Sequence, residues 1–274
     1  MSPAAREIAI RRWSLELGEP LSGGHRSDVH AVRRPGGFAA VLKVCASTRD
    51  AADEAAALSA WASSEVAVRL LDADLRAGAL LLERLVPGTP LPPGDSGPAT
   101  DVLAALHGTP LPEYAFRELA GSFPDHEREV RADLTHERRA RSEPDRAREA
   151  ERMLPSAGRL MEGLARTTHR RVLLHGDFLT KNLLASGDGY RVVDPIPRLG
   201  DPAADAGMFA HDQPAPAILD TAGELASLLG LDVDRTVAWA AVWTVMVTAQ
   251  AWRDDQADLD ALVASALFQR LLGG

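Results

Sequence analysis

The order of polar residues within segment 173–205 constrains the fold more than any other feature of the chain. The segment reads LLHGDFLTKNLLASGDGYRVVDPIPRLGDPAAD. An apolar run leads into a His-Gly-Asp triplet that ends at Asp177, and Asn182 follows five residues later. A turn over 186–189 then separates two strand-like runs, the second of which ends at Asp194. The predicted hairpin would return Asp194 to the loop that carries Asp177 and Asn182.

An acid, an amide and a second acid in this order are the set that phosphoryl transfer from a nucleotide requires. One carboxylate receives or orients the attacking hydroxyl, while an amide oxygen and the other carboxylate hold Mg²⁺ on the phosphates. Each residue alone has an ordinary explanation: Asp177 as a turn or N-cap acid, Asn182 as a loop amide, Asp194 as a strand end. The ordered set favours phosphoryl transfer over these separate explanations.

Lysine and asparagine are rare in this chain and occur at very few positions. The chain has 30 basic residues, but its lysines are only Lys43 and Lys181, and Asn182 is its single asparagine. Arginine cannot imitate a compact ammonium group in a tight phosphate pocket, and aspartate is not equivalent to a neutral carboxamide as a metal ligand. Rarity therefore marks these positions, although Lys181 either meets the γ-phosphate or simply faces solvent.

A Gly-rich turn with Gly23, Gly24 and Ser27 lies between two expected strands. Glycine permits close approach, so such a turn can lay backbone N–H groups over phosphates. It is not a Walker A loop, because no Gly-Lys-Ser/Thr follows and no helix is predicted there. A plain β-turn is the alternative.

Lys43 lies in the otherwise apolar run AAVLKV, which predicts either an edge position or a buried anionic partner. Glu54, in the next predicted helix, is the natural counter-ion, and the two together would hold the α- and β-phosphates. The side chain of Glu83 is expected to be structural. The backbone from Glu83 to Leu85 lies where the edge of an adenine would pair, so both residues are candidates for nucleotide binding.

The pattern along the chain predicts an α+β protein with a small β-rich N-terminal lobe and a larger, mainly helical C-terminal lobe. Five prolines and three glycines fall within 86–98, which places the boundary between lobes 1–87 and 88–274. The expected elements are strands at 13–17, 28–33, 39–45, 79–85, 172–174, 183–185 and 190–193, and helices at 51–61, within 115–166 with a break near 142–144, and at 217–229, 236–252 and 259–272. Trp239 and Trp243, four residues apart, are expected in the core.

Charge and composition exclude several classes of protein. Acids outnumber bases 39 to 30, giving a net charge of −9, which argues against a nucleic-acid binder. The charged N-terminal segment has no signal-peptide pattern, and the most apolar run, 237–252, is too short and polar to span a bilayer. The single cysteine, Cys45, cannot form an internal disulfide. These features predict a cytoplasmic protein without nucleic-acid or membrane partners.

The runs VLKV, DEAAAL, HGDFLTKNLL and VVDPIPRLGDPAAD occur in the order found in the aminoglycoside phosphotransferase family, which has a protein-kinase-like fold. The chain most resembles the branch of streptomycin 6-phosphotransferase and hydroxyurea phosphotransferase. The resemblance implies transfer from ATP with Mg²⁺ to a small-molecule hydroxyl. It further implies that Asp177 is the catalytic base, that His175 braces its loop, that Asn182 and Asp194 ligate Mg²⁺, and that Lys43 and Glu54 clamp the nucleotide phosphates.

The acceptor stays open at this point. An aminoglycoside or related antibiotic, inactivated by phosphorylation, is the first expectation, and hydroxyurea or another metabolite is the alternative. Several acids either line a cleft for a cationic substrate or are solvated helix ends: Asp212, Asp254, Asp255, Asp258 and Asp260.

Two further classes remain as alternatives. A metal-dependent phosphohydrolase built on His175, Asp177, His211 and Asp212 would need the last two on a helix, whereas the following Pro-rich run predicts a loop. A catalytically silent nucleotide-binding module is the other, and the presence of all three phosphoryl-transfer residues speaks against it.

Overall fold

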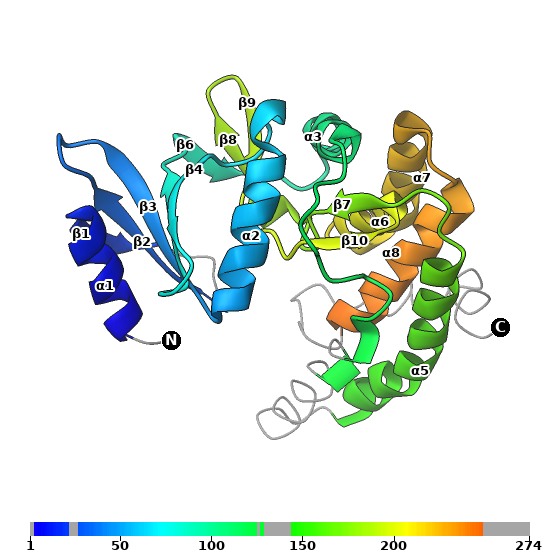
Figure 1. Cartoon of the computed structure of the whole chain (residues 1–274). Helices are drawn as coiled ribbons and strands as arrows, with labels where there is room; N and C mark the ends of the chain where they lie inside the picture. The colour runs from blue at the N-terminus through cyan, green and yellow to red at the C-terminus, as the bar shows by residue number, and fades with distance from the viewer. Residues whose placement is uncertain (1–2, 22–26, 125–126, 129–143, 249–274) are drawn as a thin grey trace.

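The computed structural model describes residues 3–21, 27–124, 127–128 and 144–248. The N-terminal region is a five-stranded antiparallel sheet in the order β1-β2-β3-β5-β4, with one helix beside it near the N-terminus and another between it and the helical region (Figure 1). Its elements are α1 (Pro3–Trp13), β1 (Glu16–Pro20), β2 (Ser27–Arg33), β3 (Ala39–Cys45), α2 (Thr48–Ala60), β4 (Leu70–Asp74) and β5 (Ala79–Glu83).

The central strand β3 owes its position to its apolar residues. Leu42 and Val44 are buried against the core of the sheet, and Lys43 pairs in register with Val29 of β2 and Leu80 of β5. Burial of the aliphatic neighbours on both sides therefore fixes Lys43 in the middle of the sheet.

Helix α2 follows β3 directly. Ser47 is its N-cap and accepts a hydrogen bond from the Asp50 backbone N–H at 3.1 Å. Small residues such as Ala51 and Ala57 are fully buried, so the helix packs closely beside the sheet. This close packing brings Glu54 of the helix to the lysine of β3.

A second, three-stranded sheet joins the two regions. It has the order β6-β8-β9, formed by β6 (Pro87–Pro90), β8 (Leu183–Ser186) and β9 (Gly189–Val192). The hairpin predicted around 186–189 is confirmed, with Ser186 paired to Gly189. The Pro-rich segment after residue 86 is not only a connection, because it contains β6 and the start of α3 (Gly97–Gly108).

The C-terminal region is helical around the two-stranded sheet of β7 (Val172–Leu174) and β10 (Arg198–Gly200). Trp239 and Trp243 stack with ring centroids 5.8 Å apart in the main core, which confirms their predicted packing role. Gly207 lets two helices approach, since a Cβ there would lie 2.7 Å from the Ala240 nitrogen. The helices are α5 (Pro144–Arg166), α6 (Pro202–His211), α7 (Ile218–Leu229) and α8 (Val233–Thr248).

Several local predictions are wrong in instructive ways. The strand expected at 13–17 is instead the end of α1 followed by β1, because Ala9 of α1 packs into the sheet core. The helix expected from 115 is absent up to residue 122, where the chain forms turns and a bridge between Glu118 and Leu199. Helix α6 was not predicted. The last expected helix, 259–272, lies outside the described residues.

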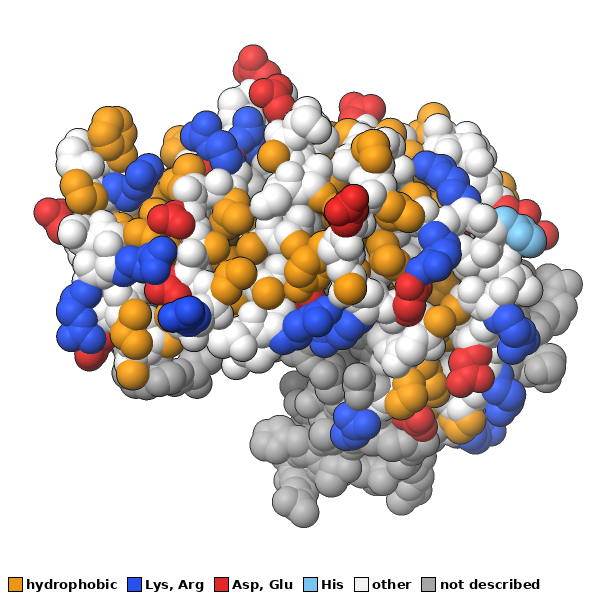
Figure 2. Space-filling model, viewed as in Figure 1, with side chains coloured by type: hydrophobic (Ala, Val, Ile, Leu, Met, Phe, Trp, Pro, Cys, Tyr) orange, Lys and Arg blue, Asp and Glu red, His pale blue; other side chains and the backbone are white. Residues whose placement is uncertain are grey.

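Two observations bear on the excluded partner classes. No helix among the described residues is long and apolar enough to cross a membrane. On the face shown in Figure 2, the described basic and acidic side chains are interspersed rather than gathered into one basic surface.

Candidate active site

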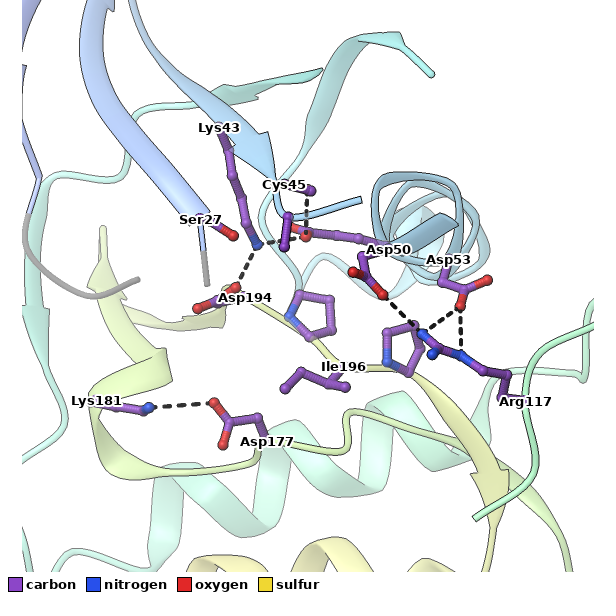
Figure 3. A pocket seen from close by; sticks show the side chains of 14 residues that line it. Ser27, Lys43, Cys45, Asp50, Asp53, Arg117, Asp177, Lys181, Asp194 and Ile196 are labelled. Atoms are coloured by element: carbon purple, nitrogen blue, oxygen red, sulfur yellow. Dashed lines mark hydrogen bonds and ion pairs between the residues drawn. The ribbon is translucent and has the colours of Figure 1, made fainter. Parts of the chain in front are cut away.

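A pocket between the N-terminal sheet and the helical region brings together five of the predicted site residues (Figure 3). Residues from β2, β3, α2 and the segment 177–197 line it. They include Ser27, Lys43, Glu54, Asp177, Lys181 and Asp194. Residues separated by more than a hundred positions in sequence therefore share one cavity.

Lys43 holds the upper part of this pocket together. Its Nζ lies 2.5 Å from Glu54 Oε2 and 2.5 Å from Asp194 Oδ1, and the residue is only 4% exposed. Burial alone would lower the pKa of Lys43, but the charges of Glu54 and Asp194 outweigh it and raise the pKa above its ordinary value. The lysine is therefore a fixed positive charge that links the sheet to the acid that follows the β8–β9 hairpin.

Asp177 lines the opposite part of the pocket, and Asn182, which is not among the lining residues, holds it. The Asn182 amide nitrogen donates to the Asp177 carbonyl oxygen and to Asp177 Oδ2, each at 2.8 Å. Lys181 Nζ lies 3.4 Å from the same carboxylate oxygen, and its side chain is half exposed. The amide thus orients the aspartate, while the remaining carboxylate oxygen carries no bond to these two residues.

The loop before Asp177 is supported from behind by a buried acid, Asp205. Its two carboxylate oxygens accept the backbone N–H groups of His175 (2.8 Å) and Gly176 (2.9 Å), and His107 Nε2 lies 3.0 Å away. Burial alone would raise the pKa of Asp205, but the hydrogen bonds and the neighbouring histidines lower it overall. An ionised carboxylate therefore fixes this loop.

His175 is fully buried and bridges the two acid-bearing segments. Its Nε2 lies 3.1 Å from the Val193 carbonyl oxygen, and its Nδ1 accepts the Asp177 backbone N–H at 3.3 Å. A carbonyl can only accept and an amide N–H can only donate, so the ring is neutral with its proton on Nε2. Burial lowers the pKa of His175, which agrees with this tautomer.

Two unusual backbone conformations shape the loops. Gly176 has φ +76°, and a Cβ there would lie 2.0 Å from the Ile196 carbonyl oxygen, so only glycine fits. Asp194 has φ 59° although it is not glycine and precedes a proline. Such conformations are held by surrounding contacts and cluster at functional sites. Here the ion pair with Lys43 is one of those contacts.

Residues 12–256 match the family described as "Aminoglycoside/hydroxyurea antibiotic resistance kinase". The chain belongs to this family. It is a phosphotransferase that acts on small molecules, and the predicted resemblance is confirmed.

Individual relatives give the same result. A hydroxyurea phosphotransferase of Kitasatospora aureofaciens is 32% identical over 84% of this chain and 67% of its own length. A streptomycin 6-kinase of Streptomyces glaucescens is 27% identical over 86% and 78%. The solved structure of the aminoglycoside phosphotransferase APH(2'')-Ib with bound ADP matches with a TM-score of 0.55 and 12% identity over 99% of this chain and 100% of that one. The kinase-like α+β fold is thereby confirmed.

Other predicted nucleotide-binding residues of this kinase lie in different surroundings. Gly23 and Gly24 lie outside the described residues. Glu83 and Leu85 are not among the residues lining the pocket. The Glu83 carboxylate accepts the Arg69 backbone N–H at 2.8 Å and is paired with Arg191 of β9.

The backbone N–H of Glu83 donates to the Arg69 carbonyl oxygen at 3.0 Å. Glu83 therefore joins β5 to the segment just before β4 through both its side chain and its backbone, as expected of a structural acid.

One expectation that counted against the phosphohydrolase alternative, a loop at residues 211–212, is wrong. His211 is the last residue of α6 and not part of a loop, and Asp212 caps that helix. Asp212 accepts hydrogen bonds from the Thr180 N–H at 2.8 Å and from its hydroxyl at 2.5 Å, which anchors the turn after Asp177. Among the described residues, no three His, Cys, Asp or Glu side chains are placed to hold a metal by themselves. The structure therefore gives the phosphohydrolase no metal cluster in the part of the chain that it describes.

The pocket of this kinase also contains residues that the sequence did not single out. Asp50 and Asp53 of α2 face Arg117, which lies in the segment after α3. Asp53 directly precedes Glu54 on a helix rich in alanine. Two adjacent acids on such a helix are a signal that could have identified Asp53, but nothing local marks Arg117.

Proposed function

We propose that this chain transfers the γ-phosphoryl group of ATP to a hydroxyl of a small antibiotic, with an aminoglycoside of the streptomycin type as the first candidate acceptor. The proposal rests on one observation: Lys43, Asp177 and Asp194 converge in one pocket, with Asn182 bonded to Asp177. Two acids, an amide and a lysine in this arrangement match the needs of phosphoryl transfer.

Asp177 is the proposed base. It lies in the pocket with its side chain about a fifth exposed, so an incoming hydroxyl can reach it. Asn182 holds one of its oxygens, which leaves the other to orient the acceptor hydroxyl. In a loose transition state the base mainly positions the nucleophile and takes its proton late.

Asn182 and Asp194 are the proposed Mg²⁺ ligands. Amide and carboxylate oxygens are hard donors suited to this ion, which usually takes one or two protein ligands and completes its shell with phosphates and water. The lack of a three-residue metal cluster among the described side chains fits such a site. When bound, Mg²⁺ would neutralise charge on the phosphates.

Lys43 is the proposed contact to the α- and β-phosphates, and Glu54 is the residue that holds it. Lys43 pairs with Glu54 and also with Asp194, so a salt bridge joins the proposed phosphate contact, Lys43, to the proposed metal ligand, Asp194. A preorganised cation of this kind stabilises charge without reorganising during the reaction. Lys181, paired with Asp177 at the pocket wall, is the proposed contact to the transferring phosphoryl group.

The charge of the pocket supports a cationic acceptor. Its walls carry five carboxylates, on Asp50, Asp53, Glu54, Asp177 and Asp194, against the cations Lys43, Arg117 and Lys181. This excess of negative charge attracts both Mg²⁺ and an amino-substituted sugar. Asp254, Asp255, Asp258 and Asp260 lie outside the described residues and remain predictions. Hydroxyurea is the second candidate, because the relative named for it shares 32% identity.

The test is a transfer assay with purified protein and MgATP. Streptomycin, hydroxyurea and a macrolide are incubated separately, and mass spectrometry detects the gain of one phosphoryl group together with ADP release. We expect phosphorylated streptomycin, loss of product with excess EDTA, and recovery on adding Mg²⁺. Phosphorylated hydroxyurea alone would select the second acceptor, and product formation unaffected by EDTA would overturn the metal assignment.

A further inference from the structure

Asp53 of α2 is a buried acid whose partners come largely from outside its own helix. It is 0% exposed. The Tyr114 hydroxyl donates to its Oδ1 at 2.8 Å, and Arg117 donates to its Oδ2 from Nε at 3.2 Å and lies 3.0 Å away at Nη2. Arg49 of the same helix completes the group at 2.8 Å. Two of the three partners therefore belong to the segment that follows α3.

That segment is attached to the strands that carry the catalytic loops. The Leu199 backbone N–H donates to the Arg117 carbonyl oxygen at 2.9 Å, and the Leu119 N–H donates to the Leu199 carbonyl at 2.9 Å. Leu199 lies in β10, which pairs with Leu173 of β7. Strand β7 leads into the loop of Asp177, and β10 follows Asp194 by four residues. Arg117 thus ties α2 to both catalytic segments at once.

We propose that Asp53, Tyr114 and Arg117 form a latch that positions the phosphate clamp. The proposal rests on the function proposed above for Lys43 and Glu54. Asp53 and Glu54 are consecutive on α2 and therefore point about 100° apart around the helix axis. Holding Asp53 against the C-terminal region fixes the rotation of α2, and this rotation decides whether Glu54 meets Lys43. The three latch residues act through Glu54 and are positioning residues.

The arrangement in Figure 3 agrees with this role. Arg117 reaches Asp50 and Asp53 from one side of the pocket, while Lys43 meets Asp194 on the other. Helix α2 therefore has contacts on two sides: Asp53 binds Arg117 of the C-terminal region, and Glu54 binds Lys43 of β3. Loss of the contact between Asp53 and Arg117 should therefore weaken the contact between Glu54 and Lys43.

Lysine labelling tests the latch without any acceptor. The chain has only two lysines, so acetic anhydride labels Lys43 and Lys181 as two separable peptides, with the exposed Lys181 as internal reference. In Arg117→Ala and Tyr114→Phe, Glu54 should leave Lys43, and the labelling of Lys43 relative to Lys181 should rise severalfold. The matched control is Arg171→Ala, which removes the exposed pair with Glu118 beside the latch and should not change the ratio.

Kinetics with the acceptor that the wild type phosphorylates provide the second arm. A misplacement of this kind costs from about tenfold to 10²-fold in kcat/KM for MgATP, with an unchanged melting temperature in Tyr114→Phe. Arg117→Lys, which restores one charged donor, should recover part of the loss.

A double-mutant cycle separates the latch from a direct contact with phosphate. If Arg117 acts through Asp53, the Asp53→Asn/Arg117→Ala protein is no worse than the poorer single variant. Additive losses would overturn the latch. So would unchanged labelling and unchanged kinetics in Arg117→Ala while Glu54→Gln is inactive, and that outcome would leave the proposed function standing. An inactive wild type would instead reject the proposed acceptor.

Discussion

The two halves of the pocket differ in how far their charged side chains are exposed to solvent. On the sheet side, the charged groups themselves are buried: Lys43 and Glu54 are at most 4% exposed and are paired with each other. On the loop side, the side chain of Asp177 is about a fifth exposed and that of Lys181 half exposed, whereas the residues that support Asp177 from behind, His175 and Asp205, are buried. A charge that holds a nucleotide can be fixed in advance, whereas a group that meets an incoming hydroxyl has to remain accessible.

This contrast predicts different kinds of failure. A substitution on the sheet side removes the cation that is already paired and so damages nucleotide handling. A substitution on the loop side either removes the reacting carboxylate or loosens it from behind. Four measurements can break or sharpen the contrast.

The largest effect is expected from Asp177→Asn. The amide keeps the shape of the side chain but cannot accept a proton, so kcat should fall by about 10²–10⁴-fold. Nucleotide affinity, measured by calorimetric titration with MgADP, should stay near the wild-type value because Asp177 is not part of the clamp. Substantial turnover in this variant would remove Asp177 as the base.

Lys43→Arg comes next. The planar guanidinium cannot occupy the site where one ammonium meets both Glu54 and Asp194 at 2.5 Å. Loss of such a preorganised charge costs about 10²–10³-fold in kcat. Unlike Asp177→Asn, this variant should also bind MgADP more weakly in the same titration. Arg33→Lys, an exposed change in β2, is the control. Wild-type kinetics in Lys43→Arg would contradict the clamp.

Local sequence signals determine which parts of the fold and of the site can be predicted. Strands β2 and β3, helix α2 and the hairpin of β8 and β9 were predicted because their apolar runs, breaks and turn residues are local signals. Lys43 was predicted as a clamp residue because a lysine in an apolar strand requires a partner. Asp177, Asn182 and Asp194 followed from their order and spacing.

The remaining elements lack such local signals. Helix α6 is buried along its whole length, so it shows no amphipathic pattern, and its one local signal is the start at Asp201 followed by Pro202. Strand β10 has three residues and exists through its pairing with β7. Arg117 belongs to no regular element, and its contacts with α2 depend entirely on tertiary folding.

Asp205→Asn tests the support on the loop side. The amide cannot accept all three donors, so the variant should lose about 1–3 kcal/mol of unfolding free energy. The folded-state pKa of Asp205 lies below its ordinary value of 3.8, so its contribution is present above that pH and is lost as the pH falls through the folded pKa. Urea titrations at several pH values should show the difference between wild type and variant shrinking in acid. A constant difference would contradict an ionised Asp205.

The smallest effect concerns His175. Its pKa is lowered from 6.5, so the unfolded chain takes up a proton more readily than the folded one. The stability contributed by the neutral ring is therefore present above pH 6.5 and declines as the pH falls below it, because a proton on Nδ1 would oppose the Asp177 N–H. In His175→Gln this part of the decline should vanish in urea titrations. His169→Gln, at an exposed position, is the control. If unfolding free energy changed equally with pH in all three proteins, His175 would not be a buried neutral ring.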